Sequence, residues 1–127
     1  MSQTGLHRED AAWLAGLFDG EACFDSPNGN PRIRLKMSDL DVVLRAAGLM
    51  DARTHREAVH STEDFPRKPL LVAQLTGDRA VHVMREVLPW LGARRSARVT
   101  DIILAHQAKA KAKAKAKPAP RSLAAAA

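Results

Sequence analysis

Cysteine and aromatic residues are scarce in this 127-residue chain, which has one cysteine, no tyrosine and 4% aromatic residues. The single cysteine, Cys23, excludes an intrachain disulfide and a cysteine-rich zinc module. No apolar run reaches the roughly 18 residues of a membrane span, so we expect no membrane partner. The N-terminus lacks the basic-then-apolar layout of a signal peptide, so we expect a cytoplasmic protein.

The net charge of +6 belongs to the C-terminal tail. Basic and acidic residues balance over residues 1–108, and the excess comes from six basic residues with no acid among them: Lys109, Lys111, Lys113, Lys115, Lys117 and Arg121. The 46% hydrophobic content suffices for one domain over residues 1–107. Residues 108–122 alternate Lys with Ala and offer almost nothing to bury. We therefore expect a disordered, basic tail over residues 108–127.

The hydrophobic pattern predicts an α+β domain in which helices alternate with pairs of strands. The expected order is helix, two strands, helix, two strands, helix, helix. The segments are a helix over 9–21, strands over 22–26 and 32–37, a helix from Leu40 to a stop at Gly48, strands over 52–60 and 70–75, a helix after Gly77, and a final helix near 93–107.

The segment 32–37 alternates basic and apolar residues without a break. Arg32, Arg34 and Lys36 fall on one face of the predicted strand, because successive side chains point to opposite sides. Three cations in register favour an anionic partner such as DNA, where arginine can read guanine or hold phosphate. Without nucleic acid, the same row would be an ordinary solvated strand face.

Small residues recur every fourth position in the first predicted helix, at Ala12, Gly16 and Gly20. Positions four apart lie nearly on one helix face, so these residues form a groove that a second backbone can approach closely. Asp19 and Glu21 stand at the negative end of the helix dipole, where acids are disfavoured. Spacing alone favours a well-packed core helix, but the acids favour a metal site at an interface.

The segment Leu14-Ala15-Gly16-Leu17-Phe18-Asp19-Gly20-Glu21 resembles the signature helix of the LAGLIDADG homing endonucleases. The segment 88–95, Leu-Pro-Trp-Leu-Gly-Ala-Arg-Arg, is similar to the turn that leads into that family's last helices. The resemblance covers roughly residues 9–107. It implies an αββαββα half-saddle with an antiparallel sheet, and a site-specific endonuclease that cleaves double-stranded DNA.

The resemblance also implies roles for individual residues. A chain with one signature helix would form a homodimer through Ala12, Gly16 and Gly20. The carboxylate of Glu21 and the carbonyl of Gly20 would bind Mg²⁺ or another divalent cation, which activates water for attack on phosphorus. Arg94 would stabilise charge at the scissile phosphate, and Asp19 would have a structural role. The basic row Arg32, Arg34 and Lys36 would face the major groove.

Two other functions are compatible with the sequence. A relative with the same saddle could recognise DNA, or regulate through it, without cutting. The chain has Ala22 where the family usually has glycine, and the turn over residues 27–31 is short, so the reading surface is small. A more remote possibility is a small structural protein whose basic tail coats nucleic acid.

Overall fold

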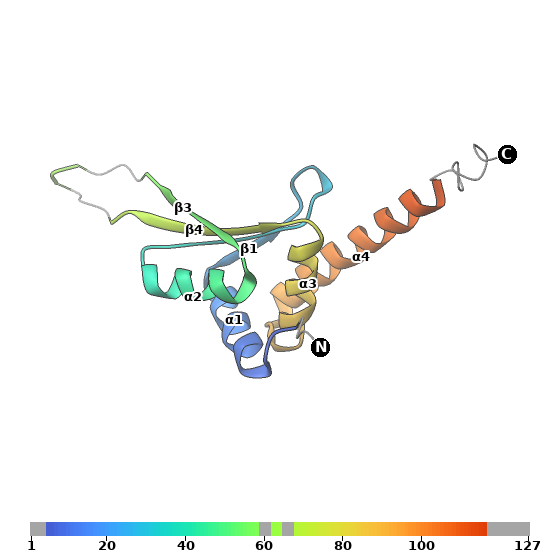
Figure 1. Cartoon of the computed structure of the whole chain (residues 1–127), viewed down its shortest axis with the longest axis horizontal. Helices are drawn as coiled ribbons and strands as arrows, with labels where there is room; N and C mark the ends of the chain where they lie inside the picture. The colour runs from blue at the N-terminus through green and yellow to red at the C-terminus, as the bar shows by residue number, and fades with distance from the viewer. Residues whose placement is uncertain (1–4, 59–61, 65–67, 117–127) are drawn as a thin grey trace, which may run out of the picture.

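The computed structural model describes residues 5–58, 62–64 and 68–116. These form an α+β structure of four α-helices and four strands in the predicted order (Figure 1). The elements are α1 Arg8–Glu21, β1 Ala22–Asp25, the 3₁₀ turn η1 Pro27–Gly29, β2 Arg32–Met37, α2 Leu40–Met50, β3 Arg53–Glu57, β4 Leu70–Thr76, α3 Asp78–Val87, the 3₁₀ turn η2 Leu88–Trp90 and α4 Ala93–Ala116.

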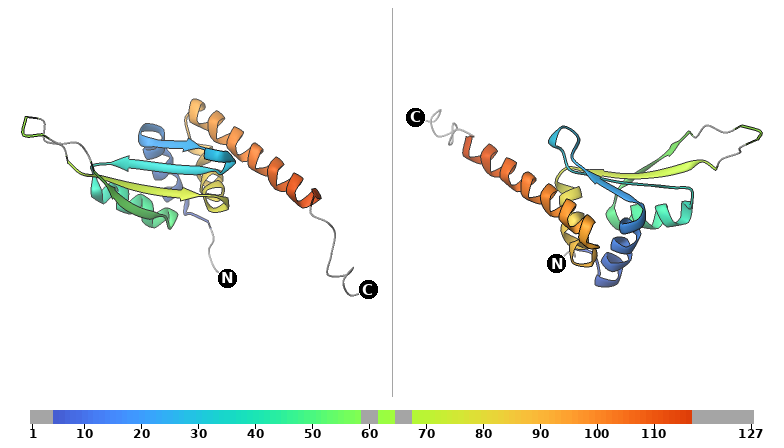
Figure 2. Two further views of the ribbon diagram at one scale, coloured as in Figure 1. Left: turned by 90° about the horizontal axis from the view of Figure 1, so that it is seen from above. Right: turned by 180° about the vertical axis from the view of Figure 1, so that it is seen from behind.

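The four strands form one antiparallel sheet in the order β1-β2-β4-β3. The helices α1, α2 and α3 and the start of α4 lie on one face, as Figure 1 and the rear view in Figure 2 show. Seen from above, the strands lie in front of the helices, so within the described residues the second face is open (Figure 2). The sheet thus has a core face and an open face.

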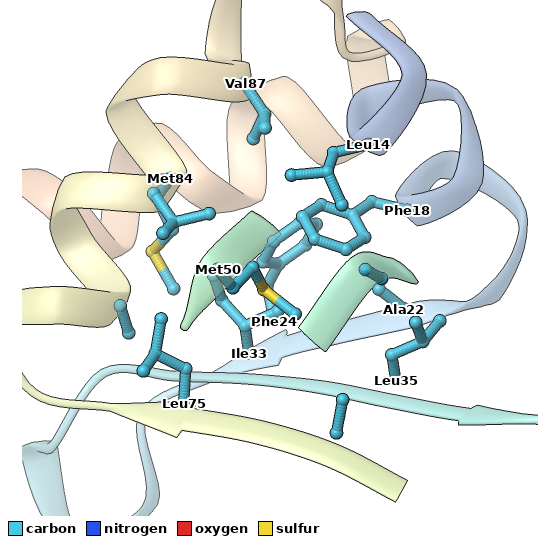
Figure 3. Close-up of a cluster of buried hydrophobic side chains, with 14 of the residues drawn as sticks. Leu14, Phe18, Ala22, Phe24, Ile33, Leu35, Met50, Leu75, Met84 and Val87 are labelled. Atoms are coloured by element: carbon cyan, nitrogen blue, oxygen red, sulfur yellow. The ribbon is translucent and has the colours of Figure 1, made fainter. Parts of the chain in front are cut away.

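The core lies between the sheet and the helices (Figure 3). Leu14 and Phe18 of α1 are fully buried there, and the ring of Phe18 meets that of Phe24 edge to face at 5.6 Å between centroids. The alternating strand β2 contributes Ile33 and Leu35, also fully buried. Burial of each such side chain stabilises the folded state by about 1.5–3 kcal/mol. The shared core therefore holds α1 against β2.

The helix α1 passes into β1 without an intervening residue. Glu21 is the last helical residue, and Ala22 is both the C-cap and the first residue of the strand, with φ −91° and ψ 156°. The N–H of Ala22 still donates to the carbonyl of Phe18, so the helical hydrogen bonding continues to the junction. Ala22 is itself buried, which fixes where the helix ends relative to the sheet.

The predicted stop of the second helix at Gly48 is wrong. The helix α2 continues to Met50 and ends at Asp51, which has a left-handed conformation with φ 54°. An interior glycine costs about 0.5–1 kcal/mol relative to alanine. Met50 is only 4% exposed and packs in the core, and its burial outweighs that cost.

The predicted disorder from residue 108 onward is also wrong as far as the structure describes the tail. The helix α4 continues through the alternating Lys and Ala residues to Ala116. Alanine and lysine are both good helix formers, and no proline interrupts them before Pro118. Once the buried first part of α4 has formed, these residues can extend the helix without burying their own side chains. The expected disorder over 117–127 lies outside the described residues.

Candidate nucleic-acid interface

The face of α1 that points away from the core contains Gly16 and Gly20, both exposed. A Cβ atom placed on either glycine would meet no atom within 4 Å. Packing inside this chain therefore does not require glycine at these positions. Ala12, Trp13 and Leu17 flank them and are half-buried, and residues 11–18 include no charged side chain. Residues 11–18 thus contribute no charge to this helix face, although the Arg45 guanidinium of α2 lies over the flanking Trp13 ring, 4.0 Å from its centroid.

The C-terminal end of α1 is held by the beginning of α4. Arg95 donates from Nε to the carbonyl of Asp19 at 2.8 Å and from Nη1 to the carbonyl of Ala22 at 2.7 Å. Both carboxylate oxygens of Asp19 accept from the backbone N–H of Gly92 at 3.0 Å. A cation is favoured at the negative end of a helix, and it compensates the nearby acids. Asp19 thus links the end of α1 to the segment that precedes α4.

Glu21 lies between these two fixed points and is exposed. Its neighbour Gly20 is exposed as well, at the same end of the helix. Carboxylate and carbonyl oxygens are the donors that Mg²⁺ takes in proteins. Among the described residues, however, no group of three or more His, Cys, Asp and Glu side chains could hold a metal ion. One chain offers one carboxylate here, so a complete site needs further ligands from a second chain or from phosphate.

An arginine pocket adjoins the junction of α1 and β1. It has a volume of about 460 Å³ and is lined by Ala22, Cys23, Phe24, Arg94, Arg95 and Arg98. Arg98 donates from Nε to the carbonyl of Phe24 at 3.1 Å, and Arg94 is exposed. Arg94 was predicted from the sequence, whereas Arg95 and Arg98 were missed. Arg98 stands four residues after Arg94 and three after Arg95, and this spacing could have indicated that it lies next to both on the helix surface.

The basic row of β2 lies on the open face of the sheet, as its alternation predicts. Each of its three cations forms an ion pair with an acidic side chain on a neighbouring strand or the next one. Arg32 forms two hydrogen bonds with Asp25, at 2.8 and 2.6 Å. Arg34 and Lys36 both donate to Glu57 at 2.9 Å, each to a different carboxylate oxygen. The ion pair with Asp25 crosses between paired strands, whereas Glu57 reaches over β4 from β3.

These ion pairs shift two pKa values. The hydrogen bond from Lys36, together with the charges of Lys36 and Arg34, lowers the pKa of Glu57 below its ordinary value. The hydrogen bond to Asp25 raises the pKa of Arg32. Val72 lies on the open face opposite Lys36 and His55, yet it is fully buried outside the core cluster. The side chains of the open face thus form an ordered layer, with Arg53 as a further cation on β3.

A scan of the sequence against models of known protein families finds no match, and a search of curated proteins finds no related sequence. Among the described helices, none combines the length and the apolar character needed to cross a membrane. Three features of this chain bear on function: the glycine face of α1, the exposed Glu21 near an arginine pocket, and the basic row on the open face of the sheet.

Proposed function

We propose that this chain is an endonuclease of the LAGLIDADG type, which cleaves duplex DNA as a homodimer with Mg²⁺ or another divalent cation. The proposed fold is that family's half-saddle. The observation that carries the proposal is the exposed face of α1, which has glycine at two positions facing open space, has no charged side chain over residues 11–18, and leads directly to an exposed carboxylate at Glu21.

Gly16 lies in the interior of α1, where glycine costs about 0.5–1 kcal/mol of helix stability relative to alanine, and Gly20 is the last residue but one of the helix. Among the described residues, no atom lies within 4 Å of a Cβ placed on either glycine, so no packing contact at these positions offsets that cost. Close approach of a second α1 across Ala12, Gly16 and Gly20 would offset it, because backbones without Cβ atoms pack closely. A two-fold axis at this contact brings the two copies of Glu21 near each other.

The open sheet face is the proposed DNA-binding surface. Arg32, Arg34 and Lys36 are positioned by ion pairs with Asp25 and Glu57, so their side chains are ordered before DNA arrives. Phosphate oxygens or guanine edges would compete with the two carboxylates for the same donors. We expect sequence preference to depend on these three residues and affinity to depend on all cations of the face.

In the proposed reaction, the Glu21 carboxylate and the Gly20 carbonyl would hold the divalent ion, which when bound would supply Lewis-acid activation of water and charge stabilisation at the leaving oxygen. Arg94 stabilises negative charge on the phosphate. Its guanidinium remains protonated, so it does not accept a proton. Arg95 is a positioning residue, because it fixes the carbonyls on either side of Glu21 rather than touching the phosphate.

The test is metal-dependent nicking of supercoiled plasmid and of a randomised duplex library. The wild type should cut with Mg²⁺, and Glu21→Gln should bind DNA but lose cutting by at least a hundredfold, since a neutral amide is a poor Mg²⁺ ligand. Asp51→Asn is the matched control, because Asp51 stands at the end of α2 and asparagine tolerates its left-handed backbone. Cutting by Glu21→Gln at the wild-type rate would refute the catalytic assignment.

DNA binding without cleavage is the second candidate. Arg94 favours it, since the family often has lysine there and a guanidinium cannot relay a proton. This candidate requires that the wild type bind duplex DNA with no metal-dependent nicking on any library member. The more remote structural role instead requires that the basic tail alone carry DNA binding, so that removal of residues 108–127 abolishes it.

A further inference from the structure

The last part of α4 is a basic arm that leaves the body of the molecule. We define the arm as residues 107–116, all exposed. At its base, the ring of His106 contacts Asp78 of α3 at 2.7 Å. One turn later, the Lys109 ammonium donates to the carbonyl of Gly29 in the β1–β2 turn at 3.5 Å. These two contacts set the direction of the arm, which projects beyond the sheet beside that turn (Figures 1 and 2).

The lysines of the arm divide into two opposite pairs. Residues two apart on an α-helix are about 200° apart around the axis, and residues four apart share a face. Lys109 and Lys113 line a groove between the arm and the turn, whereas Lys111 and Lys115 do not. The groove has a volume of about 470 Å³ and is lined by Gly29, Asn30, Pro31, Asp78, His106, Lys109, Ala110, Lys113 and Ala114.

The charges of this groove favour an anion. Lysines at i and i+4 repel each other at a cost of about 0.2–0.5 kcal/mol per pair, and residues 102–116 include no acid that could offset it. Asp78 also lines the groove; one of its carboxylate oxygens contacts the His106 ring, and its side chain is 93% exposed. The ammonium groups of Lys109 and Lys113 outnumber the single Asp78 carboxylate, so the balance of charge in the groove favours an anion bound by the two lysines.

The location of the groove decides which anion fits. The strand β1 starts directly after Glu21 and runs away from it to the turn, so the arm lies at the end of β1–β2 remote from Glu21. In the homodimer proposed above, the two arms would lie at the two outer ends of the open sheet faces. A polyanion that follows the sheet would continue into the groove at each end.

We propose that the arm binds the phosphate backbone of the duplex that flanks the recognised site, with phosphate held in the groove between Lys109, Lys113 and the β1–β2 turn. This placement rests on the proposed function, since it uses DNA bound along the open sheet face. The arm adds contacts that carry no sequence information, because phosphate is the same at every base pair.

Two matched double variants of the full-length protein test the proposal. Lys109→Ala with Lys113→Ala, and Lys111→Ala with Lys115→Ala, remove the same charge and keep strong helix formers. Binding to random-sequence duplexes of increasing length is measured by fluorescence anisotropy over a range of salt concentrations. The groove-facing pair should reduce the slope of log K against log salt by about 0.9 per lost phosphate contact, and the outward pair by less. The difference should grow with duplex length until the flanks are covered.

The outcomes separate the arm from the rest of the proposal. If both double variants reduced the salt slope equally, or neither reduced it, the groove would not be a phosphate site. The body could still bind DNA in either case. Failure of the wild type to bind any duplex at low salt would overturn both proposals. Far-UV circular dichroism of each variant checks that α4 remains helical, and a variant that keeps the wild-type spectrum but loses slope supports the groove.

Discussion

The helices α1 and α2 occupy equivalent places in the chain, since each leads into a β-hairpin, yet they end differently. The helix α1 runs straight into its strand and is held there by partly buried Arg95 from α4. The helix α2 ends in a left-handed residue, Asp51, whose carbonyl and carboxylate both contact Arg79 from α3 on the surface. An arginine from a later helix therefore contacts the end of both helices, but the Arg95 contacts are partly buried whereas those of Arg79 are exposed.

The exposed faces of the two helices also differ. Gly48 of α2 faces open space, as Gly16 and Gly20 do. In α2, however, the exposed face carries large apolar side chains, with Leu44 at 55% exposed, and the charged Arg45. The two glycines of α1 lie one turn apart on a face to which residues 11–18 contribute no charged side chain, although Arg45 of α2 lies over the neighbouring Trp13 ring. A glycine in open space is therefore not informative by itself, and its neighbours decide whether the face suits a second backbone.

The largest expected effect comes from filling the groove of α1. Gly16→Leu should lose about 1–3 kcal/mol of dimer association, because a bulky side chain keeps the two helices apart. Gly48→Leu is the control, since its side chain also enters open space in the single chain. Sedimentation in the presence of duplex DNA measures the assembly. A dimer that forms equally well with Gly16→Leu would place the subunit contact elsewhere.

The arginines that close the two helices give the next comparison. Arg95→Ala should lower the free energy of unfolding by about 1.5–3 kcal/mol, because it removes two charged hydrogen bonds from partly buried carbonyls. Arg79→Ala should cost about 1 kcal/mol or less, since its ion pair is exposed. Urea denaturation of both variants measures the difference. If Arg79→Ala lowered the free energy of unfolding more than Arg95→Ala, the contacts of Arg95 with α1 would contribute less to stability than we infer.

A smaller effect is expected at Gly48. Gly48→Ala should raise the free energy of unfolding by about 0.5–1 kcal/mol, because alanine is the better helix former and its Cβ meets no atom. Gly16→Ala should stabilise the isolated chain by a similar amount while it weakens the dimer. Thermal unfolding at dilutions that favour the single chain separates the two contributions. A destabilised Gly48→Ala variant would contradict the open environment of that site.

The smallest effect concerns Glu57, which links the second hairpin to β2. Because its pKa is lowered in the folded state, the stabilising contribution is present above the ordinary glutamate pKa of about 4.3 and is lost as the pH falls through the lowered value. Wild type and Glu57→Gln should therefore differ in stability near neutral pH and converge in acid. Urea midpoints across this range provide the measurement, and a gap that persists in strong acid would exclude the ion pairs as its cause.

Most of the fold followed from local patterns. The uninterrupted alternation of Ile33 and Leu35 with basic residues predicted β2, and the apolar run at residues 70–75 predicted β4 within one residue. Boundaries that depend on packing were missed. The end of α2 is decided by burial of Met50 against the core, and no local signal after Gly48 reports that burial.

The candidate site was only partly predictable for a related reason. The sequence placed Glu21 at the end of a helix, and the structure agrees. It did not reveal Arg95, because that side chain meets Asp19 and Ala22 across more than 70 residues of sequence. Glu57 was missed in the same way, since its contact with Arg34 and Lys36 requires the register of three strands. Long-range pairings of this kind depend on topology rather than on composition.

If the chain recognises DNA as proposed, the direct passage from Glu21 to Ala22 limits how its DNA target can change in evolution. If two copies of α1 meet on an axis, no flexible linker separates that axis from the first reading strand, so the gap between the two half-sites is built into the backbone. Substitutions on the strands could then alter which bases are preferred, but a target with a longer or shorter gap would require a different helix end.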